Sequence, residues 1–441
     1  MQDRSSKAYR YYVLALLTLA YTIGFIDRQI LNLLVQPIKA DLVLTDVQVS
    51  LLQGLAFSIG YLGLSPLFGR WVDVSPRRNI LIGVVVIWSL FTALCGVVRG
   101  FALLFAARCG VGSAEAGLTP ACWSIISDTF DDDELPRAFS IYLMGPYLGG
   151  GLALLAGGAI IEMTAHWDRS GIPLLADAAA WQIVFLLVAI PGLILGLLLL
   201  TIGEPVRRAR PGVDTSVVIP LADVFAVLRD DRRFYLNFYL GMALILMPIY
   251  AFPAWIPALL MRRFDMPISD VGYQYGIITL VTGSIGVFAG PTIGRLFAGR
   301  PDAALRVPLV AAAGIALCCV LVYLAPSPTL VLAAAGFAGF CYSLPNAMAA
   351  SAVQIASPVR MRGLTSSIYV IVVTIAGLAL APTAVALITD HVFQDEARVA
   401  ESLAIVCAAC SACGAAFLVR ALPAYRAILA GGPGASKTTL A

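Results

Sequence analysis

The sequence predicts an all-α membrane protein with twelve transmembrane helices, and three observations carry that prediction. Of its 441 residues, 60% are hydrophobic and only 12% are charged, whereas soluble domains carry about 25% charged residues. Apolar stretches of about 20 residues, long enough to cross a bilayer, recur along the chain. One long polar connection, near residues 204–233, divides these stretches six and six.

Each predicted helix is an apolar run bounded by a short polar break. The first run follows the basic residues Arg4, Lys7 and Arg10 and lacks a small-residue cleavage site, so we expect a retained helix and no signal peptide. The runs cover approximately residues 11–36, 48–68, 79–98, 102–127, 137–161, 180–203, 234–260, 272–294, 306–325, 329–350, 363–389 and 399–420. We therefore expect two six-helix halves (1–203 and 234–421), a cytoplasmic linker (204–233) and a cytoplasmic tail (422–441).

The distribution of Lys and Arg predicts the orientation of the chain. Cytoplasmic loops of membrane proteins carry an excess of these residues. If the N-terminus is cytoplasmic, the loops on the opposite side hold only Lys39, Arg99, Arg169, Arg262, Arg263 and Arg398. We therefore expect both termini to be cytoplasmic.

A repeat in the loops predicts the type of protein. The segment GRWVDVSPRR follows the second helix and GRLFAGRPDAALR follows the eighth, with Gly69 and Gly294 in corresponding places. Two halves of the same orientation joined by a cytoplasmic linker are typical of parallel-repeat secondary transporters. A twelve-helix scaffold or a passive channel is the alternative.

Catalytic and metal chemistry is not indicated. The nine cysteines lie in apolar segments, where a thiol behaves as a small hydrophobe, and no histidine lies in a predicted helix. No Ser/His or metal-ligand constellation is present. The acidic run DTFDDDELPR precedes a proline and reads as helix-capping chemistry. We expect no enzyme activity, cofactor, metal site or nucleic-acid partner.

Two predicted helices carry charged residues away from their ends. Asp27 and Arg28 lie within GFIDRQILNLL, and Arg108 and Glu115 lie seven residues apart within RCGVGSAEAG, on one helix face. Ionisable groups in a bilayer are costly unless paired or hydrated, so they are functional candidates. Residue counting brings Asp27 level with Arg108, and Arg28, turned by about 100°, must face the cavity, Glu115 or an anionic ligand. We therefore predict that the acid Asp27 carries protons and that the base Arg28 binds the substrate.

Conformational change is predicted at two further segments. Gly69 can let helices approach closely, and Asp73 can clamp Arg77, Arg78 and a neighbouring helix N-terminus in one state. The glycine-rich segment GPYLGGG, with Gly145, Pro146 and Gly149, predicts a closely packed, bendable helix. The alternative for these segments is anchoring and packing alone.

The second half is apolar and aromatic. Its seventh helix, MPIYAFPAWIPALL, has three prolines that permit a break. The predicted helices 7 to 12 carry charged residues only at or near their ends, at Arg306, Glu401 and Arg420. Such a half facing a charged one predicts an amphiphilic substrate, and ordinary helix packing is the alternative. The candidate binding residues here are Trp255, Tyr342, Asn346 and Tyr369.

These motifs resemble a known family. Gly69, Asp73, Arg77 and Arg78 match the G-x-x-x-D-R-x-G-R-R pattern of the major facilitator superfamily, with Val74 and Pro76 as departures that weaken the gate signature. The first helix and RCGVGSAEAGLTPACWSIISDTF resemble the spinster branch in its bacterial form.

The resemblance implies a major facilitator fold and a monomeric, multi-pass protein of the bacterial inner membrane, surrounded by membrane lipids. It implies proton-linked, alternating-access transport of lysophospholipids or sphingoid phosphates. Asp27 and Glu115 would be the protonatable pair, Arg28 a headgroup contact and Arg108 a partner of the acids. The alternative substrate class is small organic anions such as sugar acids.

Overall fold

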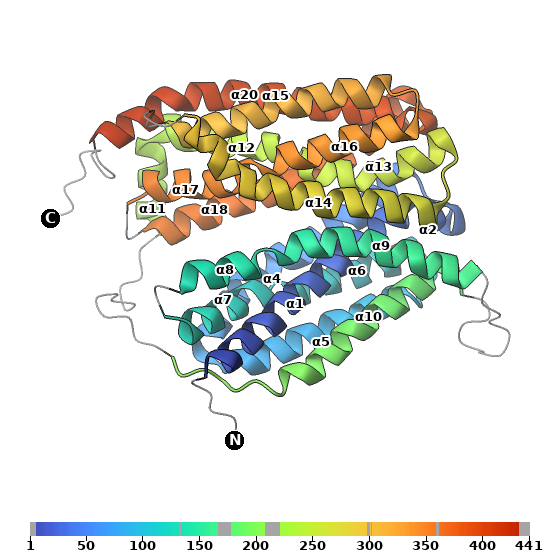
Figure 1. Cartoon of the computed structure of the whole chain (residues 1–441), viewed down its shortest axis with the longest axis horizontal. Coiled ribbons are helices and arrows are strands. Elements are labelled where there is room, and N and C mark those ends of the chain that lie inside the picture. Colours follow the sequence, from blue (N-terminus) through green and yellow to red (C-terminus); the bar gives the residue numbers. More distant parts are fainter. Residues whose placement is uncertain are drawn as a thin grey trace. The chain divides into compact units, whose positions relative to one another are not determined.

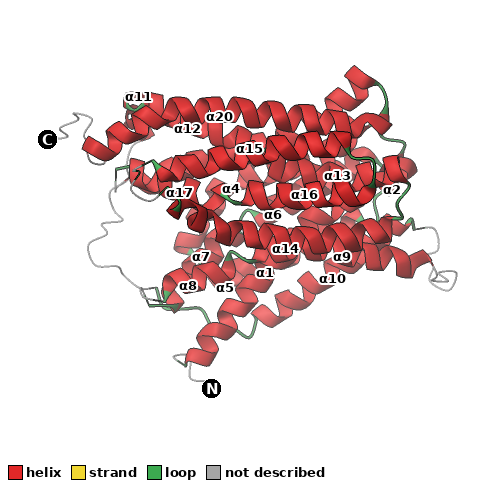
Figure 2. Cartoon of the chain, turned by 45° about the horizontal axis from the view of Figure 1, so that its top comes forward, coloured by secondary structure: helices red, strands yellow, loops and turns green. Residues whose placement is uncertain are grey.

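The computed structural model of the chain describes residues 6–131, 134–165, 178–207, 221–297, 300, 302–358 and 361–431. Helices make up its secondary structure, with no strand in these ranges (Figure 2). Twelve helical segments within them are long and apolar enough to span a membrane, which confirms the predicted number. Residues 208–220 of the predicted linker and 432–441 of the predicted tail lie outside the described ranges.

The chain forms two compact units. Unit 1 comprises Met1–Ala209 with Pro257–Leu280, and unit 2 comprises Arg210–Ile256 with Val281–Ala441. The end of the seventh predicted helix and the start of the eighth therefore belong to unit 1. The division into halves by chain order stays a prediction.

Unit 1 contains the first eleven elements in chain order. Ser6 caps the first helix by accepting a hydrogen bond from the Tyr9 N–H, and Thr45 and Gln48 form a capping box at the third. The elements are α1 (Lys7–Leu33), α2 (Val35–Leu42), α3 (Asp46–Ser50), the π-helix η1 (Leu51–Leu55), α4 (Ala56–Val74), α5 (Arg77–Cys95), α6 (Phe101–Glu115), α7 (Leu118–Thr129), α8 (Leu135–Tyr142), α9 (Gly145–Ala165) and α10 (Ala180–Leu199).

Two membrane-spanning segments of unit 1 are broken. The fourth span divides into α6 and α7 directly after Glu115, and the fifth divides into α8 and α9 before Gly145 and Pro146. The first N–H groups of a helix have no intrahelical acceptor, so a proline at that position sacrifices no hydrogen bond. Pro146 therefore favours the start of a new helix here. Helix ends inside a membrane are tolerated where protein covers them. The first of these breaks places Glu115 at a helix C-terminus.

Glycines set the helix spacing in unit 1. The helix α9 runs beside α1 (Figure 1), and a Cβ built on Gly149 would lie 2.5 Å from the Thr22 carbonyl oxygen and 2.6 Å from the Phe25 Cβ. A Cβ on Gly145 would lie 3.0 Å from the Tyr21 Cβ. The close packing predicted for GPYLGGG is therefore present at these two glycines.

A second glycine contact joins α9 to the first part of α14 (Ile268–Arg295). A Cβ on Gly151 would lie 2.9 Å from the Gly276 carbonyl oxygen, and a Cβ on Gly158 would lie 3.3 Å from the Gly272 Cα. We call these four glycines the glycine seam. Along it the two backbones approach closely, and the Leu280 Cβ also lies 2.6 Å from a Cβ built on Gly151.

Unit 2 is built from the remaining helices around an aromatic core. The rings of Phe234, Phe238 and Tyr425 stack, and Tyr239 packs against Tyr369. Its elements are α11 (Leu221–Asp230), α12 (Arg232–Leu246), the first part of α13 (Pro248–Phe264), the second part of α14, α15 (Ala303–Leu324), α16 (Pro328–Ser343), α17 (Pro345–Ala356), α18 (Arg362–Thr374), η3 (Ile375–Leu380), α19 (Ala381–Leu387), η4 (Ile388–Phe393), η5 (Glu396–Arg398) and α20 (Val399–Gly431).

The prolines of the seventh span act unequally. The span breaks between α12 and α13, where Pro248 begins the second helix. Pro253 and Pro257 lie inside α13, which continues through them. The predicted break is therefore confirmed at the first proline and is absent at the other two.

Candidate functional site

The centre of the candidate site is Asp27, which is fully buried on α1. Its Oδ2 accepts a hydrogen bond from the Thr92 hydroxyl on α5 at 3.1 Å. Arg108, also fully buried, donates from Nη1 to the main-chain carbonyl of Asp27 at 3.0 Å. The expected contact between these residues is present, but it reaches the main chain and not the carboxylate.

Arg28 faces a different set of partners, as the helical turn from Asp27 requires. Its Nη2 donates to Glu115 Oε2 on α6 at 2.7 Å, and Glu115 is buried. The Arg28 guanidinium carbon lies 4.2 Å from the ring centroid of Phe57 and 4.8 Å from that of Phe25. Aromatic faces stabilise a desolvated guanidinium. The two rings therefore hold the Arg28 guanidinium largely out of water and oriented toward Glu115.

Several polar atoms of this cluster have no hydrogen-bond partner among the described residues. They are Asp27 Oδ1, Glu115 Oε1, and Nε and Nη2 of Arg108. Native proteins rarely leave buried polar atoms unpaired, and such atoms call for water, an ion or a functional role. The cluster of Asp27, Arg28, Arg108 and Glu115, which we call the charged cluster, therefore has open capacity for water, protons or a ligand.

Arg77, predicted as a gating residue, is buried and held by acids. It forms ion pairs with Asp128, at the end of α7, and with Glu204 Oε1 at 2.8 Å, and it donates to the Ser124 hydroxyl at 2.9 Å. The Arg78 N–H also donates to Glu204 at 2.8 Å. Burial raises the pKa of Glu204, but the hydrogen bonds from Arg78 and Arg77 outweigh that effect and hold the pKa below its ordinary value.

Two contacts predicted for this loop are absent from the described conformation, and the clamp, which was predicted for one state only, stays a prediction. Asp73 is exposed and forms no ion pair or side-chain hydrogen bond within the described ranges, so it does not clamp the arginines. Instead, Arg207 donates to its main-chain carbonyl. A Cβ on Gly69 would meet no atom within 4 Å, so the predicted close helix approach is also absent there.

The acidic run precedes α8 and its first-turn proline as predicted, but the side chain at the N-cap position does not cap the helix. Glu134 occupies the N-cap position, but its side chain makes no capping hydrogen bond. It pairs with Arg10 at 2.7 Å, and Asp131 pairs with the same arginine at 3.3 Å. Asp132 and Asp133 lie outside the described residues.

Sequence reasoning missed an ion-pair group within unit 1, near the end of α13. Asp46, fully buried at the start of α3, accepts from both terminal nitrogens of Arg262 at 2.6 Å each and from Lys39 at 2.5 Å. Lys39 and Arg262 were counted only as outer-loop charges, and Asp46 was not singled out. No sequence signal pairs position 46 with position 262, because the contact depends on how α13 lies against α3.

The predicted binding residues of the second half lie in unit 2. Trp255 is fully buried, and its indole N–H donates to the Pro382 carbonyl at 3.0 Å. Tyr369 packs in the aromatic core, and Tyr342 lies 6.5 Å from Phe252 between ring centroids. Asn346 is partly buried. Packing accounts for these positions, and their role in binding stays a prediction. No group of three metal-ligating side chains gathers within the described residues.

Comparison with known proteins places this geometry in a family. The Major Facilitator Superfamily profile matches residues 17–382, most of the chain. The chain belongs to the Major Facilitator Superfamily. A crystal structure of a bacterial homologue of the human lysosomal transporter Spinster, inward-facing and unoccupied, matches with a TM-score of 0.76 and 26% identity, covering 99% of this chain and 100% of that one.

Curated relatives in the superfamily agree. An MFS-type efflux pump of Mycolicibacterium smegmatis is 28% identical over 67% of this chain and 64% of its own length. Protein spinster homolog 1 of Xenopus tropicalis is 28% identical over 70% of this chain and 58% of its own length. The match thus spans less than two thirds of either relative. This chain is a spinster-like member of the superfamily, with twelve helical segments in its described residues that are long and apolar enough to cross a membrane.

Proposed function

We propose that this transporter carries a lysophospholipid-like or sphingoid-phosphate-like amphiphile and couples its movement to protons. The supporting observation is the pairing of Arg28 with Glu115 within the charged cluster. A guanidinium binds carboxylate and phosphate with the same two-pronged geometry. The Glu115 carboxylate and an anionic headgroup therefore compete for Arg28.

This competition supplies a coupling mechanism. While Glu115 is ionised it occupies Arg28, and a buried arginine without an anion is strongly disfavoured. Protonation of Glu115 removes its negative charge and releases Arg28 to a phosphate headgroup. In the reverse step, loss of the headgroup restores the pair and expels the proton. Asp27, whose Oδ1 has no hydrogen-bond partner in the described structure, is the second protonatable carboxyl group in this scheme.

The distribution of charged and aromatic side chains between the two units supports an amphiphilic substrate. In unit 1, aromatic rings flank Arg28 of the charged cluster. In unit 2, the candidate residues are aromatic or amide side chains. A lysolipid needs a charged site for its headgroup and apolar surface for its chain. The superfamily members named above support transport, and the substrate class rests on these side chains.

A binding experiment tests the proposal. Purified protein is titrated with lysophosphatidylglycerol and with glucuronate at pH 6 and pH 8, with tryptophan fluorescence as the readout. We expect saturable lysolipid binding that is tighter at pH 6, and in Glu115→Gln binding that no longer depends on pH. Asp270→Asn, an exposed acid-to-amide change on α14, is the matched control. Saturable binding of glucuronate alone would replace the amphiphile with a small organic anion.

A further inference from the structure

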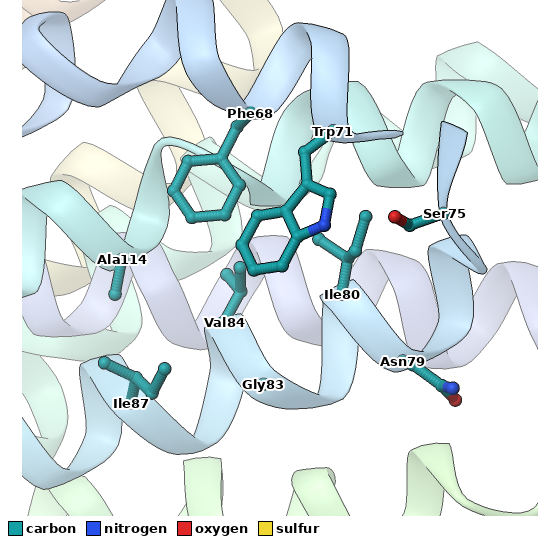
Figure 3. Close-up of a pocket in the computed structure, with 9 residues that line it drawn as sticks. All are labelled: Phe68, Trp71, Ser75, Asn79, Ile80, Gly83, Val84, Ile87 and Ala114. Carbon is teal, nitrogen blue, oxygen red and sulfur yellow. The ribbon is translucent and has the colours of Figure 1, made fainter. Parts of the chain in front are cut away.

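A cavity of about 280 Å³ lies in unit 1 between α4, α5 and α6, apart from the charged cluster (Figure 3). Apolar side chains form most of its wall. For comparison, an apolar cavity of about 150 Å³ binds benzene, so this one has room for a longer stretch of hydrocarbon. Its lining residues are Phe68, Trp71, Ser75, Asn79, Ile80, Gly83, Val84, Ile87 and Ala114.

The cavity has one polar end. Figure 3 shows Ser75 and Asn79 together at one side, while Ala114 and Ile87 lie at the other, with Phe68 and Trp71 across from Val84. The cavity is therefore amphiphilic along its length. Its apolar part runs between α4 and α5 toward α6.

Two arginines bind the two polar lining residues. Arg207 Nη2 donates to the Ser75 carbonyl at 3.0 Å and to the Val72 carbonyl at 2.8 Å. Arg78 donates from Nε and Nη2 to Asn79 Oδ1 at 3.2 and 3.1 Å. Positive charge thus flanks the polar end of an apolar cavity, which is the arrangement that matches an acyl chain bearing a phosphate.

The cavity opens at a surface that carries large apolar side chains. Trp71 is 50% exposed and Ile87 is 48% exposed. Both lie on helices that span the membrane. The polar end lies at the loop joining α4 to α5, which the distribution of Lys and Arg assigns to the cytoplasmic side. A lipid of the cytoplasmic leaflet can reach this opening with its headgroup at the level of the arginines.

We propose that this cavity binds one acyl chain of a resident anionic phospholipid, with the phosphate beside Arg78 and Arg207. The site is independent of the proposed transport substrate, which binds at the charged cluster. Its inner end, Ala114, directly precedes Glu115 in the chain, so the bound lipid contacts the helix that carries this acid. The proposed occupant is a structural lipid of the bilayer and not the transported amphiphile.

Native mass spectrometry with added phosphatidylglycerol tests the proposal. A Cβ on Gly83 would meet no atom within 4 Å, so Gly83→Leu fills the cavity without a backbone clash. Gly63→Leu on α4 is the matched control, because Gly63 is equally open but does not line the cavity. We expect retention of one phosphatidylglycerol to fall about ten-fold or more in Gly83→Leu and to stay at the wild-type level in Gly63→Leu. Equal retention in wild type and Gly83→Leu would overturn the proposal and assign the lipid to the general annulus.

A second measurement tests the site without the cavity-filling variant, and so does not require that variant to fold. Phosphatidylglycerol brominated on its acyl chain is added to wild type and to Trp71→Phe, and the difference gives the quenching of Trp71. We expect saturation at a low mole fraction of lipid, which excess inorganic phosphate does not reverse. Quenching that grows only in proportion to the bulk lipid would contradict a specific lipid site. Reversal of the quenching by phosphate would show that the arginines bind the free anion in place of the lipid. Arg207→Gln is expected to abolish the preference for phosphatidylglycerol over phosphatidylcholine, and an unchanged preference would remove the headgroup contact.

Discussion

The two acids of the charged cluster differ in what holds them. Glu115 has a cationic partner in Arg28, whereas the Asp27 carboxylate has one hydroxyl donor, Thr92. Both are buried. A buried carboxylate with few partners is disfavoured relative to its neutral form. Of the two, Asp27 therefore depends more on a proton for its stability.

Asp27→Asn removes that exchangeable proton while keeping the shape of the side chain. We expect the variant to fold with a thermal midpoint at or above that of wild type, because a neutral amide replaces a buried carboxylate. Proton-driven uptake into proteoliposomes should fall at least ten-fold, with lysolipid binding retained. Uptake that still follows an imposed pH gradient at the wild-type rate would exclude Asp27 from coupling.

Asp302 provides a pH-dependent test in unit 2. It is buried and pairs with Arg306 at 2.9 Å and with Arg426 at 2.5 Å. Burial raises its pKa, but the hydrogen bonds and charges of the two arginines outweigh burial and lower the pKa below the ordinary aspartate value. A lowered pKa means that the ionised form stabilises the fold at neutral pH, and that this contribution is lost as the pH falls through the folded-state value.

We therefore expect Asp302→Asn to lower the thermal midpoint at pH 7 and to differ progressively less from wild type as the pH falls below the ordinary aspartate range. The measurement is thermal unfolding in detergent across that range. Thr389→Val, which removes a hydroxyl hydrogen-bonded to Ser402 elsewhere in unit 2, is the control. It removes no titratable group, so any loss of thermal stability in it should not depend on pH. A wild-type advantage over Asp302→Asn that is constant with pH would show that Asp302 does not titrate as described.

At the scale of elements, the glycine spacing of α9 fixes its distance from α1. The contact lies at Thr22 and Phe25 of α1, within two turns of Asp27. The helix that carries Asp27 and Arg28 thus packs closely against glycine positions of α9. Its position is set by backbone contact, which leaves little room for adjustment.

Gly149→Leu tests that contact. Its Cβ would overlap the Thr22 carbonyl, so the helices must separate, and overpacking of this kind costs roughly 1–3 kcal/mol or more. We expect a lower thermal midpoint in detergent, while Gly150→Leu on the same helix, where a Cβ meets nothing within 4 Å, should match wild type. Equal stability of the two variants would show that α9 does not pack closely against α1 at Gly149.

The sequence allowed the helices to be predicted well because apolar length is a local property. The break at Pro248 was also predictable, since proline removes a backbone donor wherever it lies. The break after Glu115 was not predicted, and neither was the π-helix Leu51–Leu55. Such irregularities depend on which neighbours accept the freed backbone groups, and this is a tertiary property.

At the scale of the whole molecule, the charged residues of the candidate site were identifiable, but most of their partners were not. Arg28 and Glu115 stood out because charges are rare in apolar helices. Thr92 and Phe57 look like ordinary membrane residues, and only the packing of α4 and α5 brings them to the site. Arg77 was identified as a gating residue, but its partners Asp128 and Glu204 come from the ends of two other segments.

The corresponding loops of the two units form ion clusters of opposite design. In unit 1 a buried arginine, Arg77, is surrounded by acids, whereas in unit 2 a buried acid, Asp302, is surrounded by arginines. The sequence repeat between these loops predicted similar positions. It could not predict that the sign of the central charge is reversed, because that depends on which residue of each loop turns inward.

The ion-pair group at Asp46 belongs to this scale because it joins residues 216 positions apart in the chain. Asp46→Asn would leave Lys39 and Arg262, both largely buried, without their carboxylate. Breaking a buried pair by removing one partner costs about 3–5 kcal/mol, so we expect a clear fall in the thermal midpoint. Asp41→Asn, at an acid that accepts the Trp181 indole N–H, is the control, and a similar small effect of both changes would count against a structural ion pair.

The glycine seam has a consequence for the path of a lipid-like molecule. Between Gly151 and Gly158 of α9 and their counterparts on α14, the backbones approach too closely for a methyl group to fit. A hydrocarbon chain is at least as wide as a methyl group along its whole length. In this conformation, an amphiphile therefore cannot slip sideways from the bilayer between α9 and α14 at this depth, and any lateral route must open elsewhere around the protein.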